Sequence, residues 1–565
     1  MRWEAKKAED EATVKELQQS LGVSAIIATL LVQRGIQSFD AAKAFFRPQW
    51  EDLHSPFLMR DMDKAVNRIQ AALENDESIM VYGDYDVDGT TSVALLSSFL
   101  AKKSNKITPY IPDRYSEGYG ISFQGIDYAH RTGITLIIAL DCGIKAVDKV
   151  AYAKEKGIEF IICDHHLPGK ELPQAVALLD PKREDCTYPF NELCGCGIGF
   201  KLIQALTETW NAPQEDLLPY LDLVVTAIAA DIVPMDGENR TLSFFGMAQL
   251  RQRPRPGIQQ LLGELKKPAT ISDLVFKVAP RINAAGRMDH ALLAVELLQS
   301  TALDTLKRTV AAIEAFNRER RITDEHITQE ALEQIQQANE KEKATTVVYA
   351  TGWHKGVVGI VASRLIETHY RPTVVLTQSG EHYVGSVRSV KGFNVYEALT
   401  ACKEQMVQFG GHKYAAGLTL REDQLPAFKK AFEEAVASRI LPEQKTPVIV
   451  YDLAISIDEV NHKLYRIIEQ MAPFGPNNMR PVFYSSNCVD SGQTRVVGKD
   501  QSHLRLSVQT ENGPLIGIGF SMAKHYDYIK SGAPFDLLFT LDENEWNGTV
   551  SLQLKVKDIR PTATA

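Results

Sequence analysis

The feature that most constrains the fold is a repeated unit, in which a short apolar run leads into an acidic residue and then into a helix. The runs 79–82, 136–140 and 160–163 are apolar throughout, and each is followed within two residues by Asp. Strands that alternate with helices form a parallel sheet with helices on both faces. Because such a sheet is buried on both sides, its strands need not alternate with polar residues. The sequence therefore predicts an α/β fold.

The chain has room for several domains, since 565 residues correspond to about three to five domains of ordinary size. Residues 287–351 contain neither Gly nor Pro, and helical apolar spacing over 301–343 predicts one or two long helices, about 65 Å if continuous. A second αβ pattern follows. Short alternating strands at 504–508 and 552–556, with the hairpin signal Asn547-Gly548, predict a small β-barrel or sandwich. The expected divisions are a helical cap (1–50), a catalytic αβ domain (51–300), a connecting helix (301–344), a second αβ domain (345–440) and a β domain (446–565).

Composition excludes several classes of protein. No apolar run approaches the ~18 residues of a membrane span, and seven cysteines are too few for a disulfide scaffold. The charged N-terminus does not resemble a signal peptide, so we expect a cytoplasmic protein with reduced thiols and no membrane partner. The net charge of −9 argues against a protein that coats nucleic acid. It allows local basic regions, such as 251–290, which has eight Lys/Arg against three Asp/Glu.

Acidic and imidazole side chains follow the predicted strands. Asp84, Asp86 and Asp88 follow the first run, Asp141 the second and Asp164-His165-His166 the third, and Asp231 follows a fourth run, 223–230, which we interpret as a strand. The carboxyl ends of parallel strands meet at one edge of a sheet. Each Asp alone is typical of a helix N-cap, but four such ends together predict a metal site. Carboxylates with imidazoles suit Mn²⁺ or Mg²⁺, and their number predicts two ions with a shared Asp.

At these residues the chain resembles the DHH phosphoesterase superfamily, named for the Asp-His-His at 164–166. Within it, the chain is similar to bacterial exonucleases that degrade single strands from 5′ to 3′. The resemblance rests on VYGDYDVDGTT (81–91), DHHLP (164–168), AADIVP (229–234), APRINAAGR (279–287) and GGHKYAAG (410–417). It implies a DHH domain and a DHH-associated domain, both αβ, joined by a long helix, and a C-terminal β-barrel that resembles an OB fold.

The resemblance also implies a role for each residue of the metal site. Asp86 and Asp88 match paired metal carboxylates, Asp141 the bridging ligand, His165 the imidazole ligand and Asp231 the last carboxylate. Asp84 stands near a position where other members place a His ligand. For catalysis, His166 is expected beside the scissile phosphate, with Asp164 orienting a neighbouring imidazole.

A second group of residues is expected to bind the strand, and its members are Arg114, Arg281, Asn283, Arg287, Ser386, Arg388, Gly411 and His412. The resemblance implies that Arg114, Ser386 and Arg388 grip the 5′ end, and that 281–287 forms a turn facing the nucleic acid. The alternatives are structural: Arg388 closes a surface salt bridge, and Gly410–His412 is a tight turn between a helix and a strand. Tyr115, Tyr119 and Trp353 either stack on bases or pack in the core.

The resulting hypothesis is a metal-dependent 5′→3′ exonuclease acting on single-stranded DNA in repair and recombination. It would release nucleoside 5′-monophosphates and act as a monomer, with a helicase and a single-strand-binding protein as possible partners. The alternatives are a DHH phosphodiesterase for short oligonucleotides or cyclic dinucleotides, and a replication scaffold that binds single strands without catalysis. The length and the β domain argue against the first, and the complete set of metal ligands argues against the second.

Overall fold

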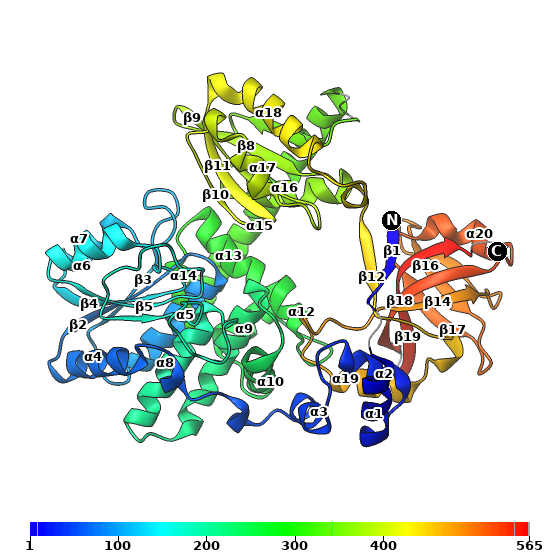
Figure 1. Cartoon of the computed structure of the whole chain (residues 1–565), viewed down its shortest axis with the longest axis horizontal. Helices are drawn as coiled ribbons and strands as arrows, with labels where there is room; N and C mark the ends of the chain where they lie inside the picture. Colours follow the sequence, from blue (N-terminus) through cyan, green and yellow to red (C-terminus); the bar gives the residue numbers. More distant parts are fainter. Residues whose placement is uncertain (8–9, 339, 341, 547, 563–565) are drawn as a thin grey trace.

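The computed structural model describes residues 1–7, 10–338, 340, 342–546 and 548–562. Figure 1 shows a large αβ part, a smaller αβ part above it and a β domain beside them. The chain passes from the large part to the small one through α15 (Leu303–Ala338), a single helix of 36 residues. At 1.5 Å per residue it is about 54 Å long. One continuous connecting helix is therefore observed. No described helix combines the length and the apolar character that crossing a bilayer would require.

The large part contains the predicted parallel sheet, in the order β3-β2-β4-β5-β6. Its strands are β2 (Ser78–Gly83), β3 (Ile107–Tyr110), β4 (Ile134–Leu140), β5 (Glu159–Cys163) and β6 (Ala177–Leu179). Gly83 pairs with Leu140, and Leu140 with Cys163, so the carboxyl ends of these strands are level. Helices cover both faces, which explains the uniformly apolar strands. One face packs against α4 (Met62–Glu74), α5 (Val87–Leu100) and α8 (Gly195–Thr209), the other against α6 (Phe123–Arg131) and α7 (Val147–Glu155).

Two local predictions are wrong. Residues 223–230 form most of helix α9 (Leu221–Asp231) rather than a strand, because a helix buried on all sides is as uniformly apolar as a buried strand. Residues 281–287 belong to helix α13 (Ala279–Met288) rather than to a turn. Gly286 lies within this helix because the helix packs closely against Tyr85. A Cβ at position 286 would lie 2.5 Å from the Tyr85 carbonyl oxygen. The other helices of this layer are α10 (Gly237–Gln252), α11 (Pro256–Leu262), α12 (Ile271–Asp273) and α14 (Leu292–Gln299).

The smaller αβ part has a mixed sheet in the order β10-β11-β9-β8-β7. Its elements are β7 (Thr346–Ala350), α16 (Val358–Thr368), β8 (Thr373–Ser379), β9 (His382–Arg388), α17 (Val395–Thr400), β10 (Gln408–Gly411), β11 (Ala415–Arg421) and α18 (Leu425–Ala437). Gly410 and Gly411 pair with β11 in an antiparallel hairpin. The alternative of a helix-to-strand turn at this position is therefore wrong.

The β domain is a seven-stranded sheet in the order β13-β14-β18-β19-β17-β16-β15. Its strands are β13 (Leu453–Ala454), β14 (Phe483–Cys488), β15 (Arg495–Val497), β16 (His503–Val508), β17 (Leu515–Gly519), β18 (Phe535–Trp546) and β19 (Thr549–Pro561), and α19 (His462–Gln470) and α20 (Tyr526–Lys530) accompany them. β18 and β19 pair antiparallel up to Trp546 and Thr549, as the expected hairpin requires, while Asn547 itself lies outside the described residues.

The N-terminal segment lies beside the C-terminal β domain (Figure 1). Helices α1 (Glu11–Leu21), α2 (Ala25–Val32) and α3 (Phe39–Phe46) share one hydrophobic core with the C-terminal sheet, and Leu17 and Ile27 belong to the same cluster as Phe483 and Phe539. β1 (Arg2–Ala5) also pairs with β12 (Val448–Tyr451). The N-terminal helices therefore pack as part of the C-terminal β domain.

Candidate active site

The carboxylates after β2 are held by backbone groups of two helices. Asp86 is the N-cap of α5 and accepts a hydrogen bond from the Gly89 N–H at 3.1 Å. Asp88 accepts bonds from the N–H groups of Gly195 and Cys196 at 2.6 and 2.7 Å, so it sits at the positive end of α8. Asp84 is buried on the same loop. The two sets of contacts hold Asp86 and Asp88 at one edge of the sheet, and Asp84 lies near enough for the charge of Asp86 to raise its pKa after burial does.

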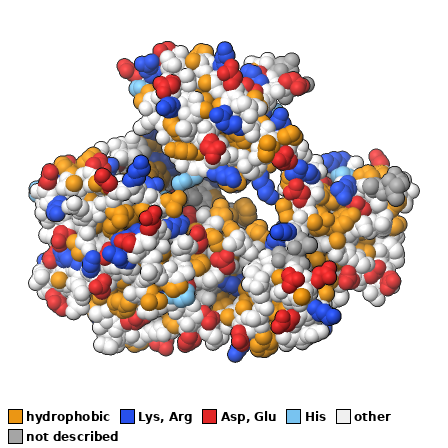
Figure 2. Space-filling view, in the orientation of Figure 1, with side chains coloured by type: hydrophobic (Ala, Val, Ile, Leu, Met, Phe, Trp, Pro, Cys, Tyr) orange, Lys and Arg blue, Asp and Glu red, His pale blue; other side chains and the backbone are white. Residues whose placement is uncertain are grey.

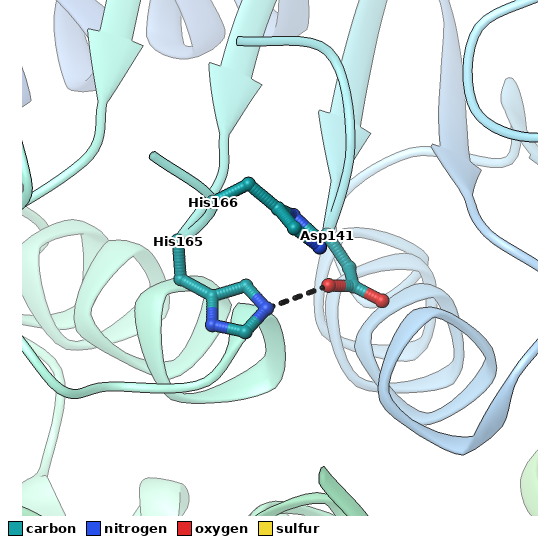
Figure 3. Close-up of side chains that lie close together, drawn as sticks. All are labelled: Asp141, His165 and His166. Carbon is teal, nitrogen blue, oxygen red and sulfur yellow. Dashed lines mark hydrogen bonds and ion pairs between the residues drawn. The ribbon is translucent and has the colours of Figure 1, made fainter. Parts of the chain in front are cut away.

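Asp141 and His165 face one another from the ends of β4 and β5 (Figure 3). His165 Nε2 lies 3.1 Å from Asp141 Oδ1 and 3.8 Å from Asp88 Oδ2, and its Nδ1 lies 3.8 Å from Asp231 Oδ2. Asp141 has a positive φ of 61°, which is uncommon for a residue other than Gly. A Cβ on Gly195 would come within 2.6 Å of the Asp141 Cβ, so the closeness of α8 to this residue requires glycine.

The donor set fits divalent metal ions. Ligand atoms of Asp141, His165 and His166 lie within 4.8 Å of one another, and so do those of Asp88, His165 and Asp231. Asp84 Oδ1 and His165 Nδ1 are buried without a hydrogen-bond partner in the described structure. Buried polar atoms are normally satisfied, and a metal ion would satisfy these. Carboxylate oxygens with few imidazoles favour Mn²⁺ or Mg²⁺.

The electrostatics of the metal-free centre support the same interpretation. Burial, and then repulsion from Asp86, raise the pKa of Asp84 to about 8 and that of Asp88 to about 7. Burial, and then the charge of Asp88, raise the pKa of Asp231 to about 8. The same two causes raise the pKa of Asp141 well above its usual range. Such a cluster stays ionised at neutral pH only when cations offset the charge.

His166 has different partners from His165. Its Nδ1 bonds to Asp164 Oδ1 at 2.8 Å and its Nε2 lies 3.3 Å from the Tyr119 hydroxyl. Burial lowers the pKa of His166, but the hydrogen bond and charge of Asp164 outweigh it, so that the net pKa is raised. For His165, burial and the neighbouring His166 lower the pKa to about 3. One imidazole is therefore held as a neutral potential ligand, and the other is poised to carry a proton.

A cleft of about 760 Å³ lies between the two αβ parts. Arg114 and Arg287 line it from the large part, and Ser386, Arg388 and Gly411 from the small one. It begins next to the acidic centre, because Arg114 lies over the ring of Tyr85, 4.7 Å from its centroid, and Tyr85 stands between Asp84 and Asp86. The chain therefore places a basic cleft against an acidic centre.

The pocket around Arg388 can bind an anion. Arg388 Nη1 donates to Ser386 Oγ at 2.6 Å. A Cβ on Gly359 would lie 2.9 Å from Arg388 Nη2 and 3.0 Å from Ser386 Oγ, so the first turn of α16 borders both side chains. N–H groups at a helix N-terminus, a guanidinium and a hydroxyl form a typical phosphate site. Burial alone lowers the pKa of Arg388, and within the described chain no carboxylate pairs with it.

Other expected strand-binding residues have different surroundings. Arg281 pairs with Glu314 of α15, with Nε 2.7 Å from Oε1, which ties it to the connecting helix. Asn283 is half-buried on α13, and His412 is exposed in the β10–β11 hairpin, outside the lining of the cleft. Trp353 is buried and donates to Glu330 at 2.6 Å, so its ring packs in the core rather than against a base. Tyr115 lines the cleft.

Sequence reasoning missed two residues beside the centre. Asp180 follows β6, is fully buried and has an unpartnered Oδ2, and burial raises its pKa to about 7. The signal was present, because 177–179 is another apolar run followed by Asp. Gly195 shapes the pocket around Asp141, but the sequence offered no signal for it, since the contact joins residues far apart in the chain.

The comparisons with known proteins agree with this architecture. Three families match separate regions: "DHH family, N-terminal domain" over 78–228, "DHHA1 domain" over 342–438 and "RecJ OB domain" over 451–558. The single-stranded-DNA-specific exonuclease RecJ of Bacillus subtilis is 36% identical over 99% of this chain and 70% of its own length. The Escherichia coli protein of the same name is 33% identical over 95% of this chain and 96% of its own length.

Solved structures show the same likeness. RecJ of Thermus thermophilus in complex with Mn²⁺ has a TM-score of 0.84 and 26% identity, covering 100% of this chain and 80% of that one. The Mg²⁺ complex gives 0.80 and 25%, covering 100% and 79%. The long connecting helix, the two αβ domains and the C-terminal OB domain are thereby confirmed. With its acidic centre and basic cleft in this arrangement, the chain belongs to the RecJ family of DHH proteins.

Proposed function

We propose that this protein hydrolyses single-stranded DNA from the 5′ end and releases nucleoside 5′-monophosphates. One observation carries the proposal: the cleft that contains Arg388 begins one side chain away from the acidic centre. A terminal phosphate carries more negative charge than an internal diester. A pocket that binds it so close to the centre would set the bond to be cut one nucleotide from the end.

Two divalent ions, Mn²⁺ or Mg²⁺, are proposed at the centre, held by Asp84, Asp86, Asp88, Asp141, His165 and Asp231. When bound, such ions neutralise the phosphodiester oxygens and lower the pKa of a shared water. Asp141 lies close to His165, and the charges of the other carboxylates raise its pKa after burial does, which suits a shared ligand.

His166 is proposed to hold a proton near the leaving 3′ oxygen. Asp164 fixes its ring through Nδ1 and raises its pKa, which leaves Nε2 beside Tyr119 at the open side of the centre. A protonated imidazole in this position can stabilise charge or donate the proton.

Neither alternative accounts for the whole chain. A phosphodiesterase for short oligonucleotides or cyclic dinucleotides would leave the OB domain without a role, and OB folds typically bind single strands. A scaffold without catalysis would not need the crowded acidic centre. A helicase that opens duplex DNA is the class of partner that supplies such a substrate.

Incubation of the protein with Mn²⁺ and strands labelled at either end tests the proposal. We expect a 5′ label to appear at once in mononucleotides, and a 3′ label to remain on progressively shorter strands. Efficient cutting of circular single strands, or early release of the 3′ label, would contradict it.

A further inference from the structure

The segment that leads into α13 exposes a phenylalanine to solvent. Phe276 is 75% exposed, the largest fraction of any large apolar side chain that the structure describes. It lies in η4 (Leu274–Val278), a single π-helical turn between α12 and α13. π-helical turns are rare and often occur at functional sites. An aromatic ring left in water forgoes the free energy of burial, so this position calls for an explanation.

Phe276 begins a partly exposed stripe of side chains that ends in the cleft. Leu274, Val278 and Ile282 are buried and face the core. On the other side, Phe276, Pro280, Asn283 and Arg287 follow at intervals of four, three and four residues, and none of them is buried. These intervals place the four side chains along one face of the helix. The stripe covers about 16 Å at 1.5 Å per residue.

The Arg287 end of the stripe lies beside the acidic centre. Gly286 packs against the backbone of Tyr85, and Arg287 lines the cleft and donates to the Gly356 carbonyl at 2.9 Å. The stripe therefore starts at the proposed terminal-phosphate pocket and leads away from the centre.

Its other end points to the β domain. In the loop before α12, Lys267 Nζ donates to the Glu543 carbonyl of β18 at 2.8 Å. Figure 2 shows an opening between the three parts of the molecule with Lys and Arg side chains at its rim, and α12 borders it in Figure 1. A strand leading from the cleft to the OB domain would cross this region.

In this segment, the ring of Phe276 is the group best placed to bind a strand that leads from the cleft to the OB domain. The two cations nearest to it along the chain are already engaged, since Lys277 pairs with Asp273 at 3.0 Å and Arg281 with Glu314 at 2.7 Å. Every nucleobase has an apolar face, so an exposed ring can stack on a base of any sequence.

We infer that Phe276 is a stacking platform for one base of the single strand, between the acidic centre and the OB domain. The inference rests on the proposed function. The stripe separates Phe276 from Arg287 by about 16 Å. At 3.4 Å per stacked nucleotide, this distance corresponds to about five nucleotides, and in an extended strand to fewer. Phe276 should therefore contact a base about three to five nucleotides from the 5′ end.

Binding in EDTA, where the strand stays intact, gives the first test. Phe276→Ala should weaken binding of a 20-nucleotide strand about 5- to 150-fold, the range for one stacked base, and Phe276→Trp should retain it. Phe57→Ala is the matched control, because Phe57 is another exposed phenylalanine (44%) in η2 (Pro56–Leu58), which packs against α4 and α8. Unchanged affinity in Phe276→Ala, or equal losses in the Ala and Trp variants, would overturn the inference.

Position along the strand gives the second test. The fluorescent base 2-aminopurine, placed in turn at positions 1 to 8, should show its largest quenching at one position between about three and five, and Phe276→Ala should abolish this maximum. A profile that is the same in wild type and variant would also overturn the inference. The fluorescence profile does not depend on cleavage. If the wild-type protein binds strands in EDTA but does not cut them with Mn²⁺, this result would therefore contradict the proposed function and leave the inference about Phe276 standing.

Discussion

Replacing Arg388 with Ala should separate recognition of the 5′ phosphate from the chemistry of cleavage. The guanidinium donates to Ser386 Oγ and to the Val387 carbonyl at 2.6 and 2.9 Å, which leaves its other N–H groups for a ligand. A hydrogen bond to a charged group contributes about 1.5–3 kcal/mol. We therefore expect kcat/KM for 5′-phosphorylated strands to fall about 10- to 150-fold, and to change much less for 5′-hydroxyl strands. Arg388→Lys should be intermediate, since an ammonium cannot bind two oxygens in one plane.

The stability of the free protein provides the control. Burial, and then the charges of Arg114 and Arg388, lower the pKa of Arg287 to about 10, so these arginines repel one another when no anion is bound. Removing Arg388 should relieve that repulsion and leave Tm unchanged or slightly higher. Kinetics with both substrates and both proteins complete a double-mutant cycle. An equal loss of kcat/KM on the two substrates would refute the reasoning, because it would show that Arg388 does not sense the terminal phosphate.

Four further predictions concern the acidic centre and the domain interface. Asp141→Asn should abolish cleavage while the protein stays folded, and activity within tenfold of wild type at saturating Mn²⁺ would remove Asp141 from the shared position. Calorimetric titration should show that His165→Ala weakens Mn²⁺ binding, whereas His166→Ala keeps the metal and slows turnover; equal losses of affinity would mean that their roles are wrongly divided. In the folded protein the pKa values of three carboxylates of the centre are raised to about 7–8, compared with about 3.9 in the unfolded chain. The folded state therefore holds protons that the unfolded chain has lost, so the metal-free protein should lose stability as pH rises from about 4 to 8. Urea unfolding in EDTA should show this fall, and Asp141→Asn should make it shallower; a rise would contradict the electrostatic account. Arg240 donates to carbonyls of the N-terminal helices and the β domain, so Arg240→Ala should lower the free energy of unfolding by about 1–3 kcal/mol, and an unchanged urea midpoint would show that these bonds contribute nothing.

The grouping of the acidic and imidazole side chains could be predicted because its signal is local. An apolar strand followed by Asp or His appears as consecutive letters, and parallel pairing brings the strand ends to one edge whatever the intervening helices contain. Asp231 was placed among these residues although its element is a helix rather than a strand. The assignment of α9 failed because a fully buried helix and a fully buried strand have the same apolar composition.

Contacts between segments that are far apart in the chain could not be predicted from the sequence. Gly195 packs on Asp141 and Gly286 on Tyr85, yet in the sequence each is an ordinary glycine. The motif around Arg281 predicts a residue that binds the strand. Its ion pair with Glu314 could not be predicted, because it depends on how α13 packs against α15. The N-terminal helices were expected as a separate cap, but they share a core with the C-terminal sheet.

The sequence by itself determined the parallel sheet, the long connecting helix, the β domain and the acidic and imidazole side chains at the sheet edge. Local periodicity and strand-end residues encode all of these, because they depend on the period of each element and on which residue ends it. Only the tertiary structure decided that the basic cleft meets the acidic centre through Arg114 and Tyr85, and that Phe276 and Arg287 lie on one partly exposed stripe. These relations depend on how helices and domains pack across hundreds of residues, and packing is set by the shape of the whole buried surface rather than by any one segment.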